Sequence, residues 1–336
     1  MAKPPLVLTL GDPSGIGPDI TLAAWQARGA GAVPPFVLVG DPDVLAARAL
    51  LLGLAVRIEI VADPREAAAC FAEALPVLPL AVARAVVPGR PDEANAGAVQ
   101  QSIERAVALV QGGAARAIVT NPVSKAVLYR AGFGFPGHTE FLASLAGTQE
   151  VAPVMMLVAD ELKVVPLTIH IPLKDVAATL TPELILSTLS TTARDLERYF
   201  GLARPRLAVT GLNPHAGEEG GLGREEIEII APAIAEARRQ GLDVSGPHPA
   251  DTLFHAQARG TYDAAIAMYH DQALIPFKTL AFDHGVNVTL GLPFLRTSPD
   301  HGTAFSLAGT GKANPMSLIE ALRLADAMAT RAGDGH

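Results

Sequence analysis

Cysteine and long apolar stretches are almost absent from this chain of 336 residues. Its single cysteine, Cys70, excludes a disulfide within the chain, which is typical of a reducing compartment. We expect Cys70 to be a small buried apolar residue of a helix. No stretch approaches the roughly 18 unbroken apolar residues of a membrane span, and the N-terminus lacks the apolar core of a secretory signal. These absences predict a soluble, cytoplasmic protein with no membrane partner.

Positive charge is also scarce. The sequence has 26 Lys and Arg against 34 Asp and Glu, a net charge of −8, with both signs mixed along the chain. No basic stripe of the kind found in nucleic-acid-binding proteins is present, so we expect no nucleic-acid partner. An anionic ligand would have to be held by local cations.

Short β-branched apolar runs alternate with longer amphipathic segments, which predicts an α/β protein with a largely parallel sheet. The length is compatible with two domains or one large α/β unit, and no linker is apparent, so the chain is expected to cross between lobes more than once. The expected strands are 6–10, 36–40, 57–61, 117–120, 154–160, 163–170, 206–211, 264–270 and 286–292. The expected helices include 19–28, 95–113, 224–241 and 317–333. Pro166 marks its run as an edge or irregular strand.

Three of the expected strands lead to histidines: His170, His215 and His270. Ligands of open parallel sheets bind beyond the carboxyl ends of the strands, and three neutral imidazoles there would hold one divalent metal with positions open for substrate. A single strand-end histidine is more often a structural residue that makes a hydrogen bond, so the argument depends on the three together. Asp271 and Gln272 follow His270 and are candidates to orient a ligand ring or a water.

Basic and glycine-rich segments accompany these strand ends. His138 and Thr139 stand at an expected helix start, where Thr139 is a candidate cap and free N–H groups suit an anion. Lys278 follows His270 by eight residues, and Arg296 follows the last expected strand. Together they suit a phosphate or carboxylate, although each alone would be read as solvated surface. "LVLTLGDPSGIGPDI" is neither a Walker loop nor a GxGxxG fingerprint, and "DHGTAFSLAGTGKANP" is typical of a ligand loop.

Taken together, these segments resemble the 4-hydroxythreonine-4-phosphate dehydrogenases of pyridoxal 5′-phosphate (vitamin B6) biosynthesis. The resemblance rests on "GDPSGIGPDI", "TNPVSK", "GHTEFLA", "IHIPLKDV", "NPHAGEEGGLGREE", "PADTLF", "MYHDQALIPFK" and "GVNVTLGLPFLRTSPDHGTAF". These motifs follow the family's order from residue 11 to about residue 315. Paralogues that act on other acids share most of them, so they are less specific for the substrate than for the family.

The resemblance implies the isocitrate/isopropylmalate dehydrogenase-like fold, with two α/β/α lobes, a cleft between them, and a homodimer. We expect residues 1–125 with 290–336 to form the first lobe and residues 126–289 the second. In the wider superfamily the loop with Gly302, Thr303, Ala304 and Asn314 resembles the one that holds the adenosine half of NAD or NADP.

The resemblance also assigns residues. His170, His215 and His270 match metal ligands contributed across the dimer interface, for Zn, Mg or Co among other divalent ions. The positions that match substrate-binding residues are His138, Thr139, Lys278, Asn287 and Arg296. Lys278 is the first candidate for proton transfer, and Asp251 is the second.

The implied reaction is the metal-assisted, NAD(P)-dependent oxidation of 4-phosphooxy-L-threonine at C3, followed by decarboxylation to 3-amino-2-oxopropyl phosphate. One alternative is a paralogue that oxidises threonate 4-phosphate, erythronate 4-phosphate, an aromatic dihydrodiol carboxylate or another 3-hydroxy acid. A different class is a metal-dependent isomerase or hydrolase without a redox cofactor, for which three histidines would serve equally well.

Overall fold

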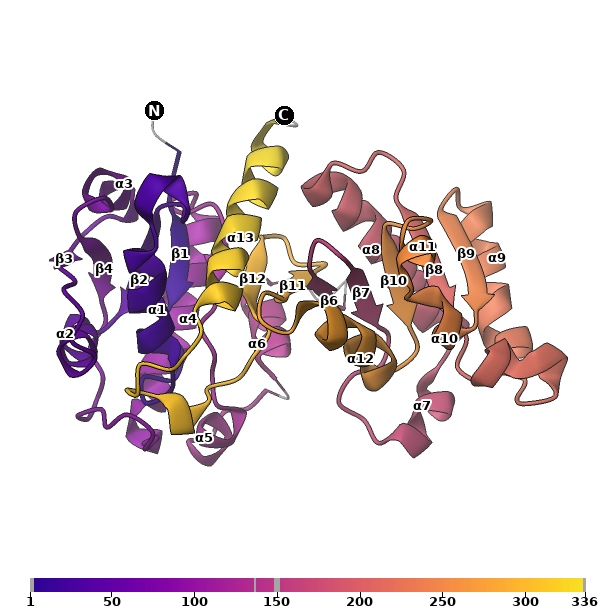
Figure 1. Ribbon diagram of the computed structural model, residues 1–336, viewed down its shortest axis with the longest axis horizontal. Helices are drawn as coiled ribbons and strands as arrows, with labels where there is room; N and C mark the ends of the chain where they lie inside the picture. Colours follow the sequence, from indigo (N-terminus) through magenta and orange to yellow (C-terminus); the bar gives the residue numbers. More distant parts are fainter. Residues whose placement is uncertain (1–2, 136, 148–151, 335–336) are drawn as a thin grey trace. The chain divides into compact units, whose positions relative to one another are not determined.

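The computed structural model describes residues 3–135, 137–147 and 152–334. Two compact units divide the chain: Met1–Pro153 with Leu292–Thr330, and Val154–Gly291 with Arg331–His336. The chain therefore leaves the first unit after residue 153 and returns at residue 292 (Figure 1). Each unit is described separately below.

The first unit is a sheet covered by helices. Its strands are β1 (Leu6–Thr9), β2 (Phe36–Gly40), β3 (Ile58–Ile60), β4 (Leu75–Pro79), β5 (Ile118–Val119) and β12 (Arg296–Pro299), in the order β3-β4-β2-β1-β5-β12. Its helices are α1 (Gly17–Gln26), α2 (Pro42–Leu51), α3 (Ala67–Cys70), α4 (Ala96–Gln111), α5 (Lys125–Arg130), α6 (His138–Leu145) and, up to Thr330, α13 (Met316–Asp334). All strand pairs recorded within this sheet are parallel.

The central strands of this unit are buried on both faces, because helices cover both sides of a parallel sheet. All four residues of β1 are buried. On one side, β1 and β2 pack with α4, α5 and α6 in one hydrophobic cluster. Cys70, expected to be buried, is half-buried at the edge of this cluster.

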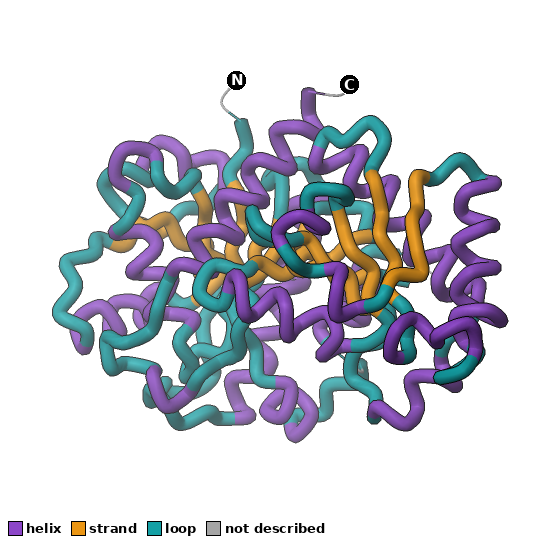
Figure 2. The backbone as a smooth tube through the Cα atoms, turned by 45° about the vertical axis from the view of Figure 1, so that its right-hand side comes forward, coloured by secondary structure: helices purple, strands orange, loops and turns teal. Residues whose placement is uncertain are grey.

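The second unit has the strand order β11-β6-β7-β10-β8-β9. These strands are β6 (Val154–Val158), β7 (Lys163–Pro166), β8 (Arg206–Thr210), β9 (Asp243–His248), β10 (Ala264–Ala267) and β11 (Val286–Leu290). The helices are α7 (Leu173–Thr179), α8 (Pro182–Phe200), α9 (Ala231–Arg239), α10 (Ala250–Leu253), α11 (Ala256–Arg259) and α12 (His270–Ala281), and a π-helical turn, η5 (Glu226–Ile230), precedes α9. Strands, helices and loops can be followed in Figure 2.

This second sheet is mixed rather than parallel throughout. Strand β6 runs antiparallel to both β7 and β11. The connection from β6 to β7 contains only residues 159–162, which is too short for a parallel crossover. Strand β7 lies between β6 and β10, so it is not an edge strand. It ends at Pro166, which pairs with Ala267 of β10 beyond the recorded pairs with β6, and this agrees with the other prediction, an irregular strand.

The α/β class is confirmed, with strands shorter than expected and several elements added. Expected strands 163–170 and 264–270 end at Pro166 and Ala267, and His270 begins helix α12. Strands β4, β9 and β12 and helices α8 and α12 were not anticipated. Among the described residues, no helix combines the length and apolarity needed to cross a membrane.

Candidate active site

The ends of β7 and β10 bring two of the predicted metal ligands together. These parallel neighbours pair Pro166 with Ala267. The chain continues alongside, because the Leu167 N–H donates to the Ala267 carbonyl (2.8 Å) and the Thr168 hydroxyl donates to the Met268 carbonyl (2.8 Å). A few residues later the ring centroids of His170 and His270 are 5.8 Å apart.

The two residues after His270 have different roles. The Asp271 carboxylate lies 2.7 Å from Nδ1 of His270. With Nδ1 as the donor, Nε2 is left with its lone pair for a metal, the usual arrangement of a ligating imidazole. Gln272, predicted for the same role, is instead buried. Its Oε1 joins two strand ends, because it accepts from the Met268 N–H and the Thr210 hydroxyl, both at 2.7 Å.

His215 lies in an unusual loop beyond β8, the other neighbour of β10. Residues 215–219 all have positive φ, and only Gly217 among them is a glycine. Left-handed backbone is unfavourable for the other four. The buried carboxylate of Glu226, at the start of η5, accepts the N–H groups of Leu212 and Asn213, both at 2.7 Å. It thereby fastens the start of the loop that carries His215.

These residues fit a divalent metal in part. His170 and His270 have the chemistry and the spacing of two ligands, and Asp271 orients one ring. Within the described part of the chain, however, no group of three or more His, Cys, Asp or Glu side chains is arranged to hold a metal ion. His215 follows the neighbouring strand, as expected, but does not complete such a group.

Three other predicted residues belong to the second unit. Lys278 is half-buried in the last turn of α12, two turns from His270, with its Nζ 5.4 Å from the centre of the Phe282 ring. Asn287 is half-buried in β11, where it pairs with Leu157 of β6. Asp251 is exposed in the short helix α10.

The first unit holds the remaining substrate-binding candidates. Arg296 begins β12 and is 6% exposed, and its Nε and Nη2 donate to the Thr120 hydroxyl (3.1 and 2.6 Å). Burial lowers the pKa of Arg296 to about 10. His138 and Thr139 begin helix α6, as predicted, but Gly137 and not Thr139 is its N-cap. The side chains of His138 and Thr139 lie outside the described residues. Thr120, from the "TNPVSK" motif, had no role assigned from sequence.

The glycine-rich turn after β1 contacts the predicted cofactor loop. The Ile16 N–H donates to the Thr303 carbonyl (3.0 Å), and a Cβ on Gly15 would lie 2.9 Å from that oxygen. Ala304 adopts left-handed backbone with φ of 39°. Gly302 has no neighbour within 4 Å of a built Cβ, and Asn314 accepts from the Met316 N–H at the start of α13.

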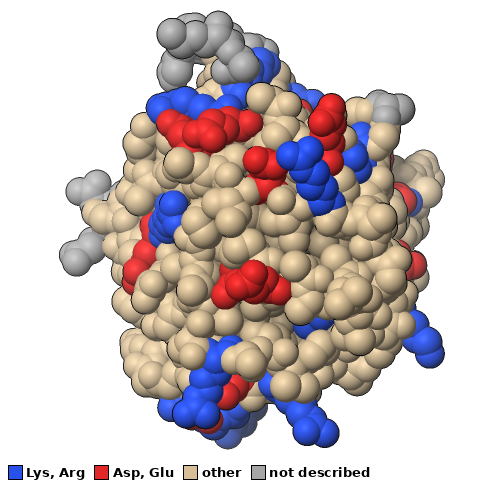
Figure 3. Space-filling view, turned by 90° about the vertical axis from the view of Figure 1, so that its left-hand side faces the viewer, with Lys and Arg blue, Asp and Glu red and all other residues tan. Residues whose placement is uncertain are grey.

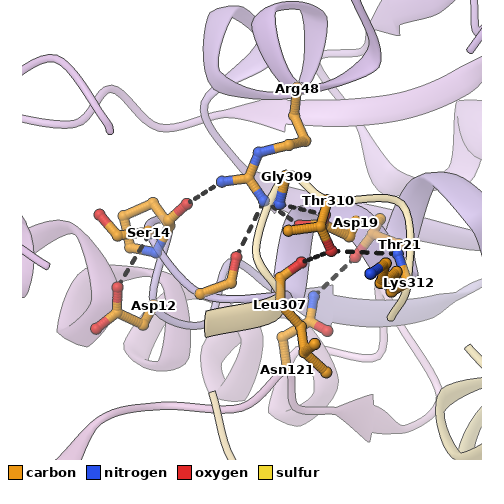
Figure 4. Close-up of polar contacts among 12 residues, drawn as sticks. Asp12, Ser14, Asp19, Thr21, Arg48, Asn121, Leu307, Gly309, Thr310 and Lys312 are labelled. Carbon is orange, nitrogen blue, oxygen red and sulfur yellow. Dashed lines mark hydrogen bonds and ion pairs between the residues drawn. The ribbon is translucent and has the colours of Figure 1, made fainter. Parts of the chain in front are cut away.

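Two charged residues that were not predicted from sequence support this turn. Arg48 of α2 and Asp19 of α1 form a buried ion pair (Figure 4). Burial lowers the pKa of Arg48, and Asp19 opposes that effect. Asp19 belongs to the motif "GDPSGIGPDI" but had no role assigned, and Arg48 occurs within an ordinary helical pattern 29 residues away, so nothing local indicates the pair.

Nearby, Asn121 and Asp12 complete the polar lining of the turn. The Asn121 side chain donates to the Thr9 carbonyl (3.0 Å) and the Thr21 hydroxyl (2.9 Å). Burial raises the pKa of Asp12, while the N–H of Ser14, 3.0 Å from its carboxylate, lowers it. On the face that Figure 3 shows, acidic and basic side chains lie close together.

Comparisons with known proteins cover almost the whole chain. A family model described as "Pyridoxal phosphate biosynthetic protein PdxA" matches residues 32–325. A 4-hydroxythreonine-4-phosphate dehydrogenase of Methylorubrum extorquens (strain PA1) is 58% identical over 335 residues, covering 98% of this chain and 96% of the relative.

Two solved structures are also similar. The 4-hydroxythreonine-4-phosphate dehydrogenase from Klebsiella pneumoniae is 41% identical, with a TM-score of 0.85 over 97% of this chain and 99% of that one. A terephthalate 1,2-cis-dihydrodiol dehydrogenase from Burkholderia xenovorans LB400 is 29% identical, with a TM-score of 0.64 over 98% and 97% of the two chains.

Proposed function

Because the chain belongs to the family of the pyridoxal phosphate biosynthetic protein PdxA, we propose that it oxidises 4-phosphooxy-L-threonine at C3 with NAD(P)+. Decarboxylation of the resulting β-keto acid yields 3-amino-2-oxopropyl phosphate, an intermediate of vitamin B6 biosynthesis. The observation that carries this proposal is the 58% identity, over nearly the full length of both chains, with a 4-hydroxythreonine-4-phosphate dehydrogenase. The chain is accordingly an oxidoreductase of the dehydrogenase class.

Arg296 supports a phosphorylated substrate. A buried guanidinium with two nitrogens directed at the Thr120 hydroxyl is held in one orientation, and a fixed guanidinium fork suits a phosphate. We assign phosphate binding to Arg296 with His138 and Thr139, whose position at the start of α6 adds free backbone N–H groups. Binding energy at the phosphate then orients the distant C3 carbon.

A dehydrogenase of this family uses a nicotinamide cofactor and a divalent metal. We propose that His170 and His270 supply two metal ligands and that His215 supplies the third, with Zn, Mg or Co as the ion. When bound, such a metal lowers the pKa of a substrate hydroxyl and polarises a ketone oxygen. Asp271 holds the His270 ring in the ligating tautomer.

Lys278 is our candidate for the proton transfer. Its half-buried position two turns along α12 from His270 keeps its ammonium group on the same element as a metal ligand. In its neutral form, Nζ would accept the proton of the C3 hydroxyl, and Asn287 would bind the substrate beside it. Asp251 is a second candidate for the proton acceptor.

For the cofactor we propose the loop with Gly302, Thr303, Ala304 and Asn314. Gly302 is open to close approach, and the loop is fastened to the glycine-rich turn through Thr303. These features suit a ligand that lies against backbone, as an adenosine does without a GxGxxG fingerprint.

We further propose a cytoplasmic homodimer with the metal site at the subunit interface. Four large apolar side chains near the histidine pair are exposed: Ile275 by 66%, Phe282 by 73%, Leu173 by 68% and Ile171 by 37%. Ile275 and Phe282 are seven residues apart, two turns along the α12 region, and so lie on one face. An exposed apolar surface of this kind supports a contact with a second copy of the chain.

The test is a coupled assay. The purified protein is incubated with 4-phosphooxy-L-threonine, a divalent metal and NAD+ or NADP+, and NAD(P)H formation is followed by absorbance. We expect a metal-dependent rise that a chelator abolishes. Absence of NAD(P)H formation with every hydroxy-acid substrate would refute the dehydrogenase and leave the metal-dependent isomerase or hydrolase to be tested.

The second candidate is a paralogue that oxidises another 3-hydroxy acid. The similarity to a terephthalate dihydrodiol dehydrogenase favours an aromatic dihydrodiol carboxylate as one such substrate, at a lower identity of 29%. Threonate and erythronate 4-phosphate belong in the same substrate panel. Turnover of one of these, with none of 4-phosphooxy-L-threonine, would assign the chain to that paralogue.

A further inference from the structure

The ion pair between Arg48 and Asp19 is buried beneath the glycine-rich turn. Their side chains are 2% and 4% exposed. Arg48 also donates from Nη1 to the Gly15 carbonyl (3.0 Å) and from Nη2 to the Pro13 carbonyl (3.1 Å). One guanidinium therefore joins α2 to α1 and to two points of the turn, which only a planar fork of several donors can do.

Asp19 extends this connection to the loop at 300–315. Its Oδ1 accepts the backbone N–H of Gly309 at 2.7 Å, while Oδ2 pairs with Arg48. Figure 4 shows the Asp19 carboxylate between Arg48 and the N–H of Gly309. The loop is therefore held at two points six residues apart, by the turn at Thr303 and by helix α1 at Gly309.

We infer that Arg48 and Asp19 are positioning residues for the nicotinamide cofactor, because they hold the loop in its binding conformation before the cofactor arrives. This inference rests on the proposed cofactor role of the loop. A loop that is already ordered loses less conformational entropy on binding. It should therefore bind the cofactor more tightly than the same loop without one of these two hydrogen bonds. Arg48 and Asp19 act on cofactor binding through the backbone of the loop that they hold.

The test uses Arg48→Lys, which keeps the charge opposite Asp19 and removes the fork to Gly15 and Pro13. Trp25 is the only tryptophan of the chain and lies in α1, the helix of Asp19, so its fluorescence is a probe of NADH and NADPH binding without substrate. We expect the Kd of the reduced cofactor to rise about tenfold, the change that corresponds to one hydrogen bond of a charged group. With NAD(P)+ at saturation, kcat and the KM for 4-phosphooxy-L-threonine should stay within about twofold, because the loop is not expected to contact that substrate.

Arg116→Lys is the matched control. Arg116, two residues before β5, forms an Arg–Asp pair with Asp326 of α13 in the same unit, with side chains 16% and 36% exposed. The recorded side-chain contacts of Arg116 are with Asp326 and Thr330 of α13. The Arg116→Lys variant should bind NADH and NADPH with the affinity of the wild type. Equal weakening in both variants would mean a general loosening of the unit and would overturn the inference.

A second variant tests the same inference if Arg48→Lys does not fold. Asp19→Asn combined with Arg48→Gln removes both charges, which leaves no unpaired buried ion, and should weaken cofactor binding in the same way. Wild-type affinity in either folded variant overturns the role of the pair while leaving the proposed function intact. A wild-type protein that binds neither NADH nor NADPH refutes the proposed cofactor and this inference with it.

Discussion

Glu226 offers the sharpest test of how the strained loop with His215 is held. Its carboxylate is 4% exposed and accepts the N–H groups of Leu212 and Asn213 at 2.7 Å and the Asn213 side-chain amide at 3.0 Å. The perturbation is Glu226→Ala, which deletes the acceptor and leaves two backbone N–H groups without it. We expect the loop to open locally.

The magnitude follows from two contributions. Four non-glycine residues in left-handed backbone cost about 1–2 kcal/mol each, or about 4–8 kcal/mol that the surrounding contacts must offset. Each hydrogen bond to a charged acceptor contributes about 1.5–3 kcal/mol, so the two backbone bonds contribute about 3–6 kcal/mol. Losing them should remove most of the free energy that keeps residues 215–219 in this conformation.

The assay is amide hydrogen exchange of residues 212–220, with denaturant unfolding in parallel. We expect protection of this segment to be lost in Glu226→Ala, with a smaller change in the global free energy of unfolding, because the strands of the second unit have a separate hydrophobic core. Zinc or cobalt affinity, measured by titration calorimetry, should fall as His215 becomes mobile.

Glu228→Gln is the control for charge removal on the same turn. Glu228 is exposed and pairs only with Arg224, one helical turn away, among its recorded contacts. Such a surface pair contributes at most about 1 kcal/mol, so exchange of residues 212–220 should not change. Wild-type protection of the loop in Glu226→Ala would refute the reasoning, since the strain would then be held by other contacts.

Three further predictions concern other parts of the molecule. His270→Ala should lower the bound divalent metal, measured by elemental analysis, and abolish turnover with the fold unchanged by circular dichroism; full metal content would contradict the ligand assignment. Gly11→Ala should destabilise the protein by more than about 1 kcal/mol in denaturant unfolding, because φ is +68° and the new Cβ would lie 2.6 Å from that of Asn121. Burial, together with the charge of Arg238, lowers the pKa of His248 below its ordinary value of about 6.5. Below that pH the unfolded chain therefore binds more protons than the folded chain, and the free energy of unfolding falls on acidification. His248→Gln should reduce that loss between about pH 7 and pH 5, and an unchanged pH profile would exclude His248 as its source.

The sequence by itself was sufficient for the fold class, most of the central strands and the family. Buried parallel strands are nearly continuous apolar runs, which is why 6–10, 36–40 and 206–211 were recognised within a residue or so of their ends. Strand β4, with two prolines in "LPVLP", and β12, with "RTSP", lack that pattern and were missed. The family followed from ordered motifs that extend over most of the chain.

Only the tertiary structure decided which side chains meet. Their places after two strands predicted that His170 and His270 meet, but only the register of β7 against β10 fixes the 5.8 Å between their ring centroids. Gln272 looked like a partner of the site and instead joins β8 to β10 through three hydrogen bonds. Local patterns report burial and backbone preference, whereas a contact between distant residues depends on how whole elements pack. For that reason, the ion pair of Arg48 with Asp19 forms only in the folded chain. The same holds for the hydrogen bond from the Gly309 N–H to Asp19.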